Sequence, residues 1–187
     1  VMHAALITIG AILGFFVWNY PLGVIFLGDG GAYFLGFWVA ELSILLIQRN
    51  ETVSPLFPLM VCAYPIFETL FSMYRRKVVR GRPVGQPDAA HLHSLIYRRI
   101  MRRLTVAPGV DLPLRRNSMT SPYLWGLCTT TAFPSVVWWG SDAMLGIALV
   151  VFCAIYISTY RAIVRFSVPR LAWISVKLMS GGRVSRM

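Results

Sequence analysis

The chain has 187 residues, of which 57% are hydrophobic and only 13% are charged. Its mean hydropathy is +0.64, whereas soluble domains carry roughly 25% charged residues. This composition excludes an ordinary soluble domain and indicates an integral membrane protein. The formal net charge of +11 would suggest a nucleic-acid partner in a soluble protein, but Lys and Arg accumulate in the cytoplasmic loops of membrane proteins. We therefore expect membrane lipid, and no nucleic acid, among the partners.

Five stretches are apolar and long enough, or nearly so, to cross a bilayer, which takes about 20 residues. They cover residues 2–18, 32–47, 54–73, 123–139 and 143–160. Residues 74–122 then form a long basic cytoplasmic loop, and residues 161–187 form a basic cytoplasmic tail. The sequence therefore predicts an all-α fold, a polytopic transmembrane helix bundle of about five spans within residues 1–160.

The basic residues predict the orientation of these spans. Seventeen of the eighteen Lys and Arg residues lie in the 74–122 loop or after the fifth span, and five alternating spans put both regions on one side. Only Arg49 lies opposite. The positive-inside rule makes the basic side cytoplasmic. We expect a multi-pass protein of the cell inner (plasma) membrane whose active face is cytoplasmic.

Prolines are expected to interrupt some of the spans. Pro58, Pro65 and Pro134 lie inside predicted spans, where a proline removes a backbone hydrogen bond and kinks or locally opens a helix. Glu68 lies in the same span as Pro65, and Arg75 follows it within two turns. Acids within a membrane are costly and tend to be paired or functional. Pairing of Glu68 with Arg75 or its neighbour Arg76 is the simpler expectation.

Asp29 lies in a glycine-rich connection, Gly28-Asp29-Gly30-Gly31, just before the second span. Glycine lets a backbone come close to a ligand, and the N-terminus of the following helix favours anions. A carboxylate there could hold Mg²⁺, whose other positions take phosphate oxygens. Asp-Gly is also a common turn, and from the residues alone a turn is the simpler interpretation.

Two of the three histidines, His91 and His93, lie in the basic loop. Being two residues apart, they face the same way if the backbone is extended. Imidazoles could donate to a pyrophosphate or assist proton transfer, and Arg80 and Arg82 could grip phosphates. A loop that is merely basic and cytoplasmic explains these residue types equally well. A zinc site is disfavoured because no Cys and no second His pair is nearby.

The order of these segments resembles the C-terminal half of a known family. The matching pieces are Asn19 with Pro21, residues 25–32 and 35–37, residues 65–69, Arg75-Arg76, Arg80-Gly81-Arg82 and residues 87–93. The family is the polyprenyl-phosphate N-acetylhexosamine-1-phosphate transferases (glycosyltransferase family 4), in the undecaprenyl-phosphate GlcNAc-1-phosphate transferase-like branch. The resemblance covers about residues 1–120 well and the last two predicted spans in hydropathy only.

The resemblance implies a function. Such a transferase moves N-acetylhexosamine-1-phosphate from a UDP-N-acetylhexosamine to undecaprenyl phosphate, requires Mg²⁺, releases UMP and initiates lipid intermediates of cell-surface polysaccharides, such as lipopolysaccharide and the cell wall. The resemblance also implies that Asp29 is a catalytic residue that ligates or supports the metal. The substrate-binding residues that it implies are Asn19, Arg80, Arg82, His91 and His93.

Three departures from the family pattern qualify this expectation. Glu68 stands where the family often has Asp, and Ser94 stands where the family often has another His. Leu92 between His91 and His93 favours the branch that handles simple N-acetylhexosamines. The family also carries an early Asp-Asp pair that this sequence lacks. We therefore expect that the N-terminal half of the enzyme is absent and that this chain is inactive alone.

A non-enzymatic polytopic membrane protein, such as a transporter subunit or an assembly scaffold, is the alternative function. It would explain the spans and the basic loops, but not an acid and two histidines that converge on one face. A homodimer is a candidate assembly in either case, and the sequence does not indicate which sugar would be transferred.

Overall fold

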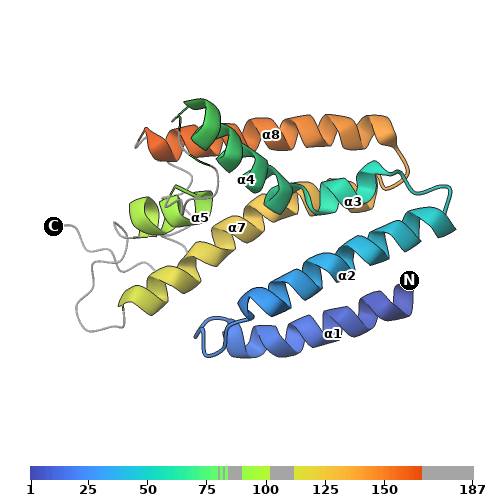
Figure 1. Ribbon diagram of the computed structural model, residues 1–187, viewed down its shortest axis with the longest axis horizontal. Coiled ribbons are helices and arrows are strands. Elements are labelled where there is room, and N and C mark those ends of the chain that lie inside the picture. The colour runs from blue at the N-terminus through green and yellow to red at the C-terminus, as the bar shows by residue number, and fades with distance from the viewer. Residues whose placement is uncertain (80, 82, 84–89, 102–111, 166–187) are drawn as a thin grey trace.

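The computed structural model describes residues 1–79, 81, 83, 90–101 and 112–165, and every regular element among them is helical (Figure 1). The helices are α1 (Met2–Asn19), α2 (Gly28–Arg49), α3 (Leu56–Val61), α4 (Ala63–Tyr74), α5 (Leu92–Leu95), α7 (Leu112–Val137) and α8 (Asp142–Val164). Two π-helical turns, η1 (Arg75–Val79) and η2 (Ile96–Met101), directly extend α4 and α5. The predicted all-α fold is confirmed.

Three of the described helices, α1, α2 and α8, are long and apolar enough to cross a membrane. They coincide with the predicted spans 2–18, 32–47 and 143–160, and they support an integral membrane protein. The other two predicted spans are not among these three helices. Residues 54–73 fold into two helices, and residues 123–139 belong to a longer helix with a polar beginning. The arrangement with five spans stays a prediction.

The break between α3 and α4 is centred on Cys62, whose backbone has φ −92° and ψ 10°. Pro65 follows three residues later and has no N–H to donate to the carbonyl of Val61, so the helix opens one turn before the proline. The local opening expected at Pro65 is therefore found. In contrast, α7 continues through both Pro122 and Pro134.

The helices begin earlier than hydropathy indicated. The helix α7 starts at Leu112 and not near residue 123, and α2 starts at Gly28 and not near residue 32. Hydropathy detects only the apolar part of a helix, so a polar or glycine-rich first turn looks like a loop. The 74–122 loop consequently contains η1, α5, η2 and the first turns of α7.

One face of α8 forms the centre of the core. Its buried residues are Leu145, Ala148, Phe152, Tyr156, Tyr160 and Ile163. Their spacing of three and four residues puts them on one side of the helix. Phe67 and Phe71 of α4 pack edge-on against Tyr156, with ring centroids 4.9 and 5.5 Å away. These contacts hold α4 against the second half of α8.

Two connections meet at one end of the structure. The backbone N–H of Ser54 donates to the carbonyl of Trp139 at 3.0 Å, and the Ser54 hydroxyl donates to Asp142. The helices α2 and α8, with 22 and 23 residues, lead away from these connections and are about 33 and 35 Å long at 1.5 Å per residue. The beginning of α2 and the end of α8 therefore both lie toward the opposite end (Figure 1).

Candidate functional site

Glu68 of α4 binds three groups that come from two other segments. Its Oε1 accepts a hydrogen bond from the backbone N–H of Leu92 at 3.0 Å and lies 3.0 Å from Nδ1 of His91. Its Oε2 accepts a hydrogen bond of 2.5 Å from the hydroxyl of Tyr156. The Glu68 side chain is only 12% exposed, so these bonds compensate for the carboxylate's lost hydration. Glu68 thereby joins α4, α5 and α8.

The ion partner of Glu68 is His91, and not Arg75 or Arg76 as expected. Nη2 of Arg76 lies 3.5 Å from Nε2 of His91. A guanidinium can only donate hydrogen bonds, so Nε2 of His91 is the acceptor in its contact with Arg76. Nδ1 of His91 then carries the hydrogen and donates the hydrogen bond to Glu68. The carboxylate thus orients the imidazole of His91.

The rings of His91 and His93 stack, with centroids 5.7 Å apart and planes inclined by 12°. The expectation that they face the same way is confirmed, although extended backbone accounts only for His91, since His93 lies in α5. His93 lines a polar cavity of about 460 Å³ together with Arg98, Asn117 and Ser121. One cation and several hydroxyl and amide groups suit a polar, anionic ligand in this cavity.

The pKa of His93 provides a prediction. Burial, and secondarily the neighbouring His91, lowers the pKa of His93 from its ordinary value of 6.5. The unfolded state therefore binds a proton more readily than the folded state, and stability is lost as the pH falls below about 6.5. We expect His93→Gln to remove this part of the pH dependence of thermal unfolding between about pH 5 and 8. An NMR titration that gives His93 a pKa of 6.5 or higher would contradict the expectation.

Two arginines tie the histidine segment to the end of α8. Nη1 of Arg75 donates to the carbonyl of Ala90 at 2.6 Å and to the hydroxyl of Tyr160, and its guanidinium lies 5.3 Å from the centre of the Tyr160 ring. Nη1 of Arg99 donates to the carbonyls of Ile163 and Val164, at 2.8 and 2.5 Å. These are last-turn carbonyls of α8, which lack partners within the helix. Both flanks of the histidine segment are thus fixed to α8.

Loss of the Glu68 carboxylate should destabilise the protein. In Glu68→Ala the buried Leu92 N–H and the Tyr156 hydroxyl lose their acceptor, which costs about 1–3 kcal/mol for each orphaned group. Tyr156→Phe removes one bond and should cost less, about 0.5–1.5 kcal/mol. Thermal unfolding of the purified full-length protein in detergent would measure both. The matched control is Glu41→Ala in α2, where the described residues include no hydrogen-bond partner for the acid, and a loss there as large as in Glu68→Ala would contradict the prediction.

Asp29 lies in the first turn of α2, not in the connection before it, and its side chain is exposed. Gly28 begins this helix with φ +69°, a conformation that glycine adopts easily and other residues rarely do. Asn19 closes the preceding turn, because its Nδ2 donates to the carbonyl of Ile25 at 2.8 Å. Asn19 therefore positions the segment that leads to Asp29, and its contact here is with backbone.

The structure does not join Asp29 to the histidines directly. Within the described residues no hydrogen bond or ion pair connects Asp29 with His91 or His93. The α1–α2 connection that precedes Asp29 does contact α7, where Tyr20 packs on Trp125 with ring centroids 4.8 Å apart. The neighbouring Leu124 lines the polar cavity beside His93. Arg80 and Arg82 lie outside the described residues.

The acids and histidines do not form a preformed metal centre in the part of the chain that the structure describes, where no three His, Cys, Asp or Glu side chains gather around one point. Mg²⁺ is often held by one or two carboxylates together with substrate phosphates and waters. An exposed carboxylate such as Asp29 fits that role, in which the ligand itself completes the coordination.

Sequence reasoning singled out Glu68 but expected the wrong partner for it, and it missed Tyr156. For Glu68 a signal existed, since an acid in an apolar stretch needs a partner, but the partner was sought on the same helix. For Tyr156 there was no signal, because a tyrosine in an apolar span looks like a packing residue.

Comparison with known proteins identifies relatives. Residues 1–47 match the model of glycosyl transferase family 4. A Bacillus subtilis protein named probable undecaprenyl-phosphate N-acetylglucosaminyl 1-phosphate transferase is 34% identical over 94 residues, which are 50% of this chain and 26% of the relative. The undecaprenyl-phosphate alpha-N-acetylglucosaminyl 1-phosphate transferase of Thermotoga maritima is 32% identical over 107 residues, which are 57% of this chain and 35% of the relative.

The Escherichia coli K12 protein of the same name is 33% identical over 97 residues, 48% of this chain and 26% of the relative. The chain thus spans only about a quarter to a third of the length of these curated relatives. No solved structure matches it significantly. The chain is thus similar to the model of glycosyl transferase family 4 over residues 1–47 and to these transferases over about half of its own length.

Proposed function

We propose that this chain forms part of the active site of a membrane enzyme that transfers N-acetylhexosamine-1-phosphate from a UDP-sugar to undecaprenyl phosphate. The observation that carries the proposal is the bonding of Glu68 to His91, Leu92 and Tyr156, which fixes an imidazole pair beside a polar cavity. The names of the curated relatives give the acceptor and the reaction class. Because the chain spans a minor part of those relatives, the activity of the whole protein is inferred.

In this proposal His91 and His93 contact the phosphates of the nucleotide sugar. Phosphoryl transfer proceeds through a loose transition state that requires positioning and charge neutralisation more than covalent chemistry. A phosphate could be contacted by Nε2 of His91, while Glu68 on the other side of the ring holds Nδ1 and orients the imidazole. Arg80 and Arg82 would add positive charge to the same ligand, and Asn19 would hold the segment before Asp29 in place.

Asp29 is proposed as the ligand or support of Mg²⁺. The metal would neutralise charge on the phosphate oxygens as the bond to the leaving UMP breaks. Asp29 contributes a carboxylate at the N-terminus of α2, where the helix dipole also favours the phosphates. The chain itself would supply one ligand, while the diphosphate and water would supply the others.

The proposed active face is cytoplasmic, at the inner (plasma) membrane. The α1–α2 connection and the end of α8 lie toward one end of the structure (Figure 1), and two basic residues of the 74–122 region, Arg75 and Arg99, bind the last turns of α8 there. The positive-inside rule then assigns it to the cytoplasm, where UDP-sugars are expected. We also propose that the chain has five membrane spans, that residues 161–187 form a basic cytoplasmic tail and that the protein forms a homodimer.

The test is UMP release by the purified full-length protein that carries this sequence. We expect release only when a UDP-N-acetylhexosamine, undecaprenyl phosphate and Mg²⁺ are all present, and no release from the 187-residue chain alone. A screen of UDP-sugars would then identify the donor. Absence of release from the full-length protein with any donor would contradict the proposal and favour a transporter subunit or an assembly scaffold.

A further inference from the structure

Two tyrosines of α8 contact the charged side chains that hold the histidine segment. Tyr156 and Tyr160 are both buried, and their spacing of four residues puts them on one face of the helix. The Tyr156 hydroxyl donates to Glu68 of α4. The Tyr160 hydroxyl accepts a hydrogen bond from Arg75, the first residue of η1. Hydroxyls from successive turns of α8 thus each bind one charge of the α4–η1 segment.

Glu68 and Arg75 together hold the three successive residues 90–92. Nη1 of Arg75 donates to the carbonyl of Ala90 at 2.6 Å. Glu68 accepts from the backbone N–H of Leu92 and from Nδ1 of His91, both at 3.0 Å. His91 precedes α5 and has extended backbone, with φ −63° and ψ 149°. These side-chain contacts, and not a preceding helical turn, therefore fix the direction of its imidazole.

The tyrosines complete the binding of both charged side chains. Glu68 and Arg75 are largely buried, and a buried charge is tolerated only where it is paired or hydrogen-bonded. Tyr156 binds Oε2 of Glu68 while the histidine segment binds Oε1, so both oxygens of the carboxylate are held. Tyr160 accepts from the same Nη1 of Arg75 that donates to residue 90. The guanidinium carbon also lies 5.3 Å from the centre of the Tyr160 ring, within the range of a cation–π contact.

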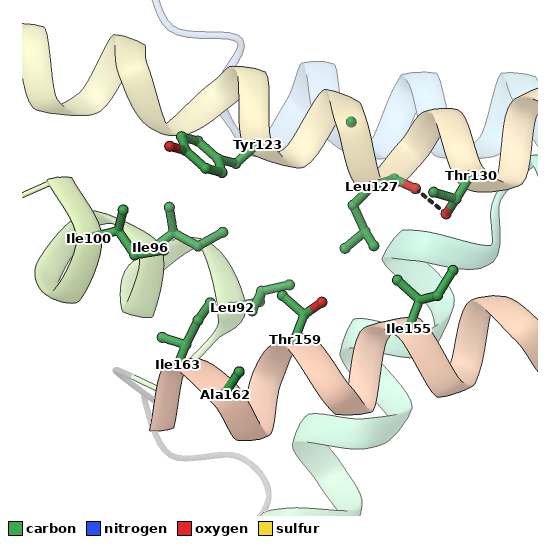
Figure 2. Close-up of a pocket in the computed structure, with 11 residues that line it drawn as sticks. Leu92, Ile96, Ile100, Tyr123, Leu127, Thr130, Ile155, Thr159, Ala162 and Ile163 are labelled. Carbon is green, nitrogen blue, oxygen red and sulfur yellow. Dashed lines mark hydrogen bonds between the residues drawn. The ribbon is translucent and has the colours of Figure 1, made fainter. Parts of the chain in front are cut away.

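The tyrosine rings are themselves held by packing. Phe71 of α4 packs edge-on against both Tyr156 and Tyr160, with ring centroids 5.5 and 4.9 Å away. A tyrosine side chain has only two χ angles, so this packing fixes where each hydroxyl points. Leu92 lies beside the same part of α8, because it lines an apolar cavity of about 280 Å³ together with Thr159 (Figure 2). The second half of α8 is therefore a rigid support for residues 90–92.

We propose that these two tyrosines are positioning residues that orient the imidazole of His91 through Glu68 and Arg75. The use of that imidazole on phosphate rests on the proposed function. Neither tyrosine touches the phosphates, and each acts through the charged side chain that it binds. A misplacement of about 1 Å can cost about 10²-fold in rate. We therefore expect loss of either hydroxyl to lower kcat far more than it raises KM, because the imidazole itself remains available for binding.

Removal of one hydroxyl at a time tests the proposal. Tyr156→Phe and Tyr160→Phe delete the oxygen that binds the charge and keep the ring that packs on Phe71. Tyr64→Phe is the matched control, because the Tyr64 ring lies in the same aromatic cluster, 6.5 Å from that of Tyr156. Among the described residues, none hydrogen-bonds to the Tyr64 hydroxyl. Thermal unfolding establishes the temperature range in which all three variants are folded.

The first measurement is NMR of the histidine ring nitrogens in the full-length protein in detergent, without substrate. The shifts of these nitrogens report the tautomer and the hydrogen bonds of an imidazole, and loss in His91→Ala assigns the signals of His91. We expect Tyr156→Phe and Tyr160→Phe to move these signals, while those of His3 in α1 stay in place. Tyr64→Phe should move neither. Unchanged His91 signals in the two folded variants, or the same movement in Tyr64→Phe, would overturn the proposal.

Steady-state kinetics of UMP release then separate positioning from a merely stabilising role. We expect kcat to fall by about 10–10²-fold in Tyr156→Phe and in Tyr160→Phe, with the KM for the UDP-sugar nearly unchanged. Tyr64→Phe should have wild-type kinetics. A wild-type kcat in both of the other variants would overturn the proposal. The NMR readout needs no turnover, so displaced His91 signals in a protein whose wild type releases no UMP would contradict only the proposed function.

Discussion

Asp29→Asn in the full-length protein should abolish Mg²⁺-dependent UMP release. Asn keeps the size of the side chain but removes the charge, which is the property that Mg²⁺ requires of its ligand. Loss of an outer partner of a metal site costs about 10–100-fold, and loss of a direct ligand should cost more. Folding should be unaffected, because Asp29 is exposed in the first turn of α2. UMP release at increasing Mg²⁺ concentration measures the effect.

The control for Asp29→Asn is Glu51→Gln. Glu51 is an exposed acid in the connection between α2 and α3, near the end of the structure where Ser54 meets Trp139. It should retain wild-type turnover and Mg²⁺ dependence. Full activity in Asp29→Asn would remove this residue from the site and favour the non-enzymatic alternative.

His91→Ala should reduce turnover by about 10²–10³-fold, the usual cost of removing one positioned hydrogen-bond donor that stabilises charge in the transition state. The change removes the only imidazole that Glu68 binds, so both the group that meets the phosphate and its orientation are lost. The affinity for the UDP-sugar should also fall, since the group is proposed to contact phosphate. Steady-state kinetics with varied UDP-sugar separate the two effects.

Two comparisons make the His91 result specific. His3→Ala, in α1 at the far end of the helix from Asp29, should leave the kinetics unchanged. Glu68→Gln should preserve part of the packing while weakening the hydrogen bond that orients His91, and it should reduce turnover by less than His91→Ala. Equal kinetics for His91→Ala and His3→Ala would rule out the proposed role of His91.

The fold class was predictable because apolar stretches of the required length are explicit in the sequence. The limits of α1 and α8 followed closely from hydropathy. The beginning of α7 at Leu112 could not be predicted from hydropathy, because the first turns of this helix are polar. Their helical state depends on packing. The separation of α3 from α4 was expected as a local opening at Pro65, but its position at Cys62 is a property of the backbone geometry.

The candidate site was predictable as a set of residue types and not as a set of contacts. The stacked histidines could be expected from their spacing, although half of the local backbone is helical rather than extended. The pairing of Glu68 with His91 joins residues from different helices, and no local pattern encodes it. The same is true of Tyr156 and Tyr160, which become part of the site only because α8 packs against α4.

The central claim is that Asp29, the Glu68-bound His91 and the neighbouring His93 act on one metal-bound diphosphate. The three histidines of the chain, His3, His91 and His93, provide the most direct test. Mn²⁺ in place of Mg²⁺, added with a UDP-N-acetylhexosamine to the full-length protein, broadens the NMR signals of imidazoles close to it. We predict that the signals of His91 and His93 broaden while that of His3 stays sharp, and that Asp29→Asn removes the effect. Sharp signals from His91 and His93, or the same broadening in Asp29→Asn, would contradict the claim.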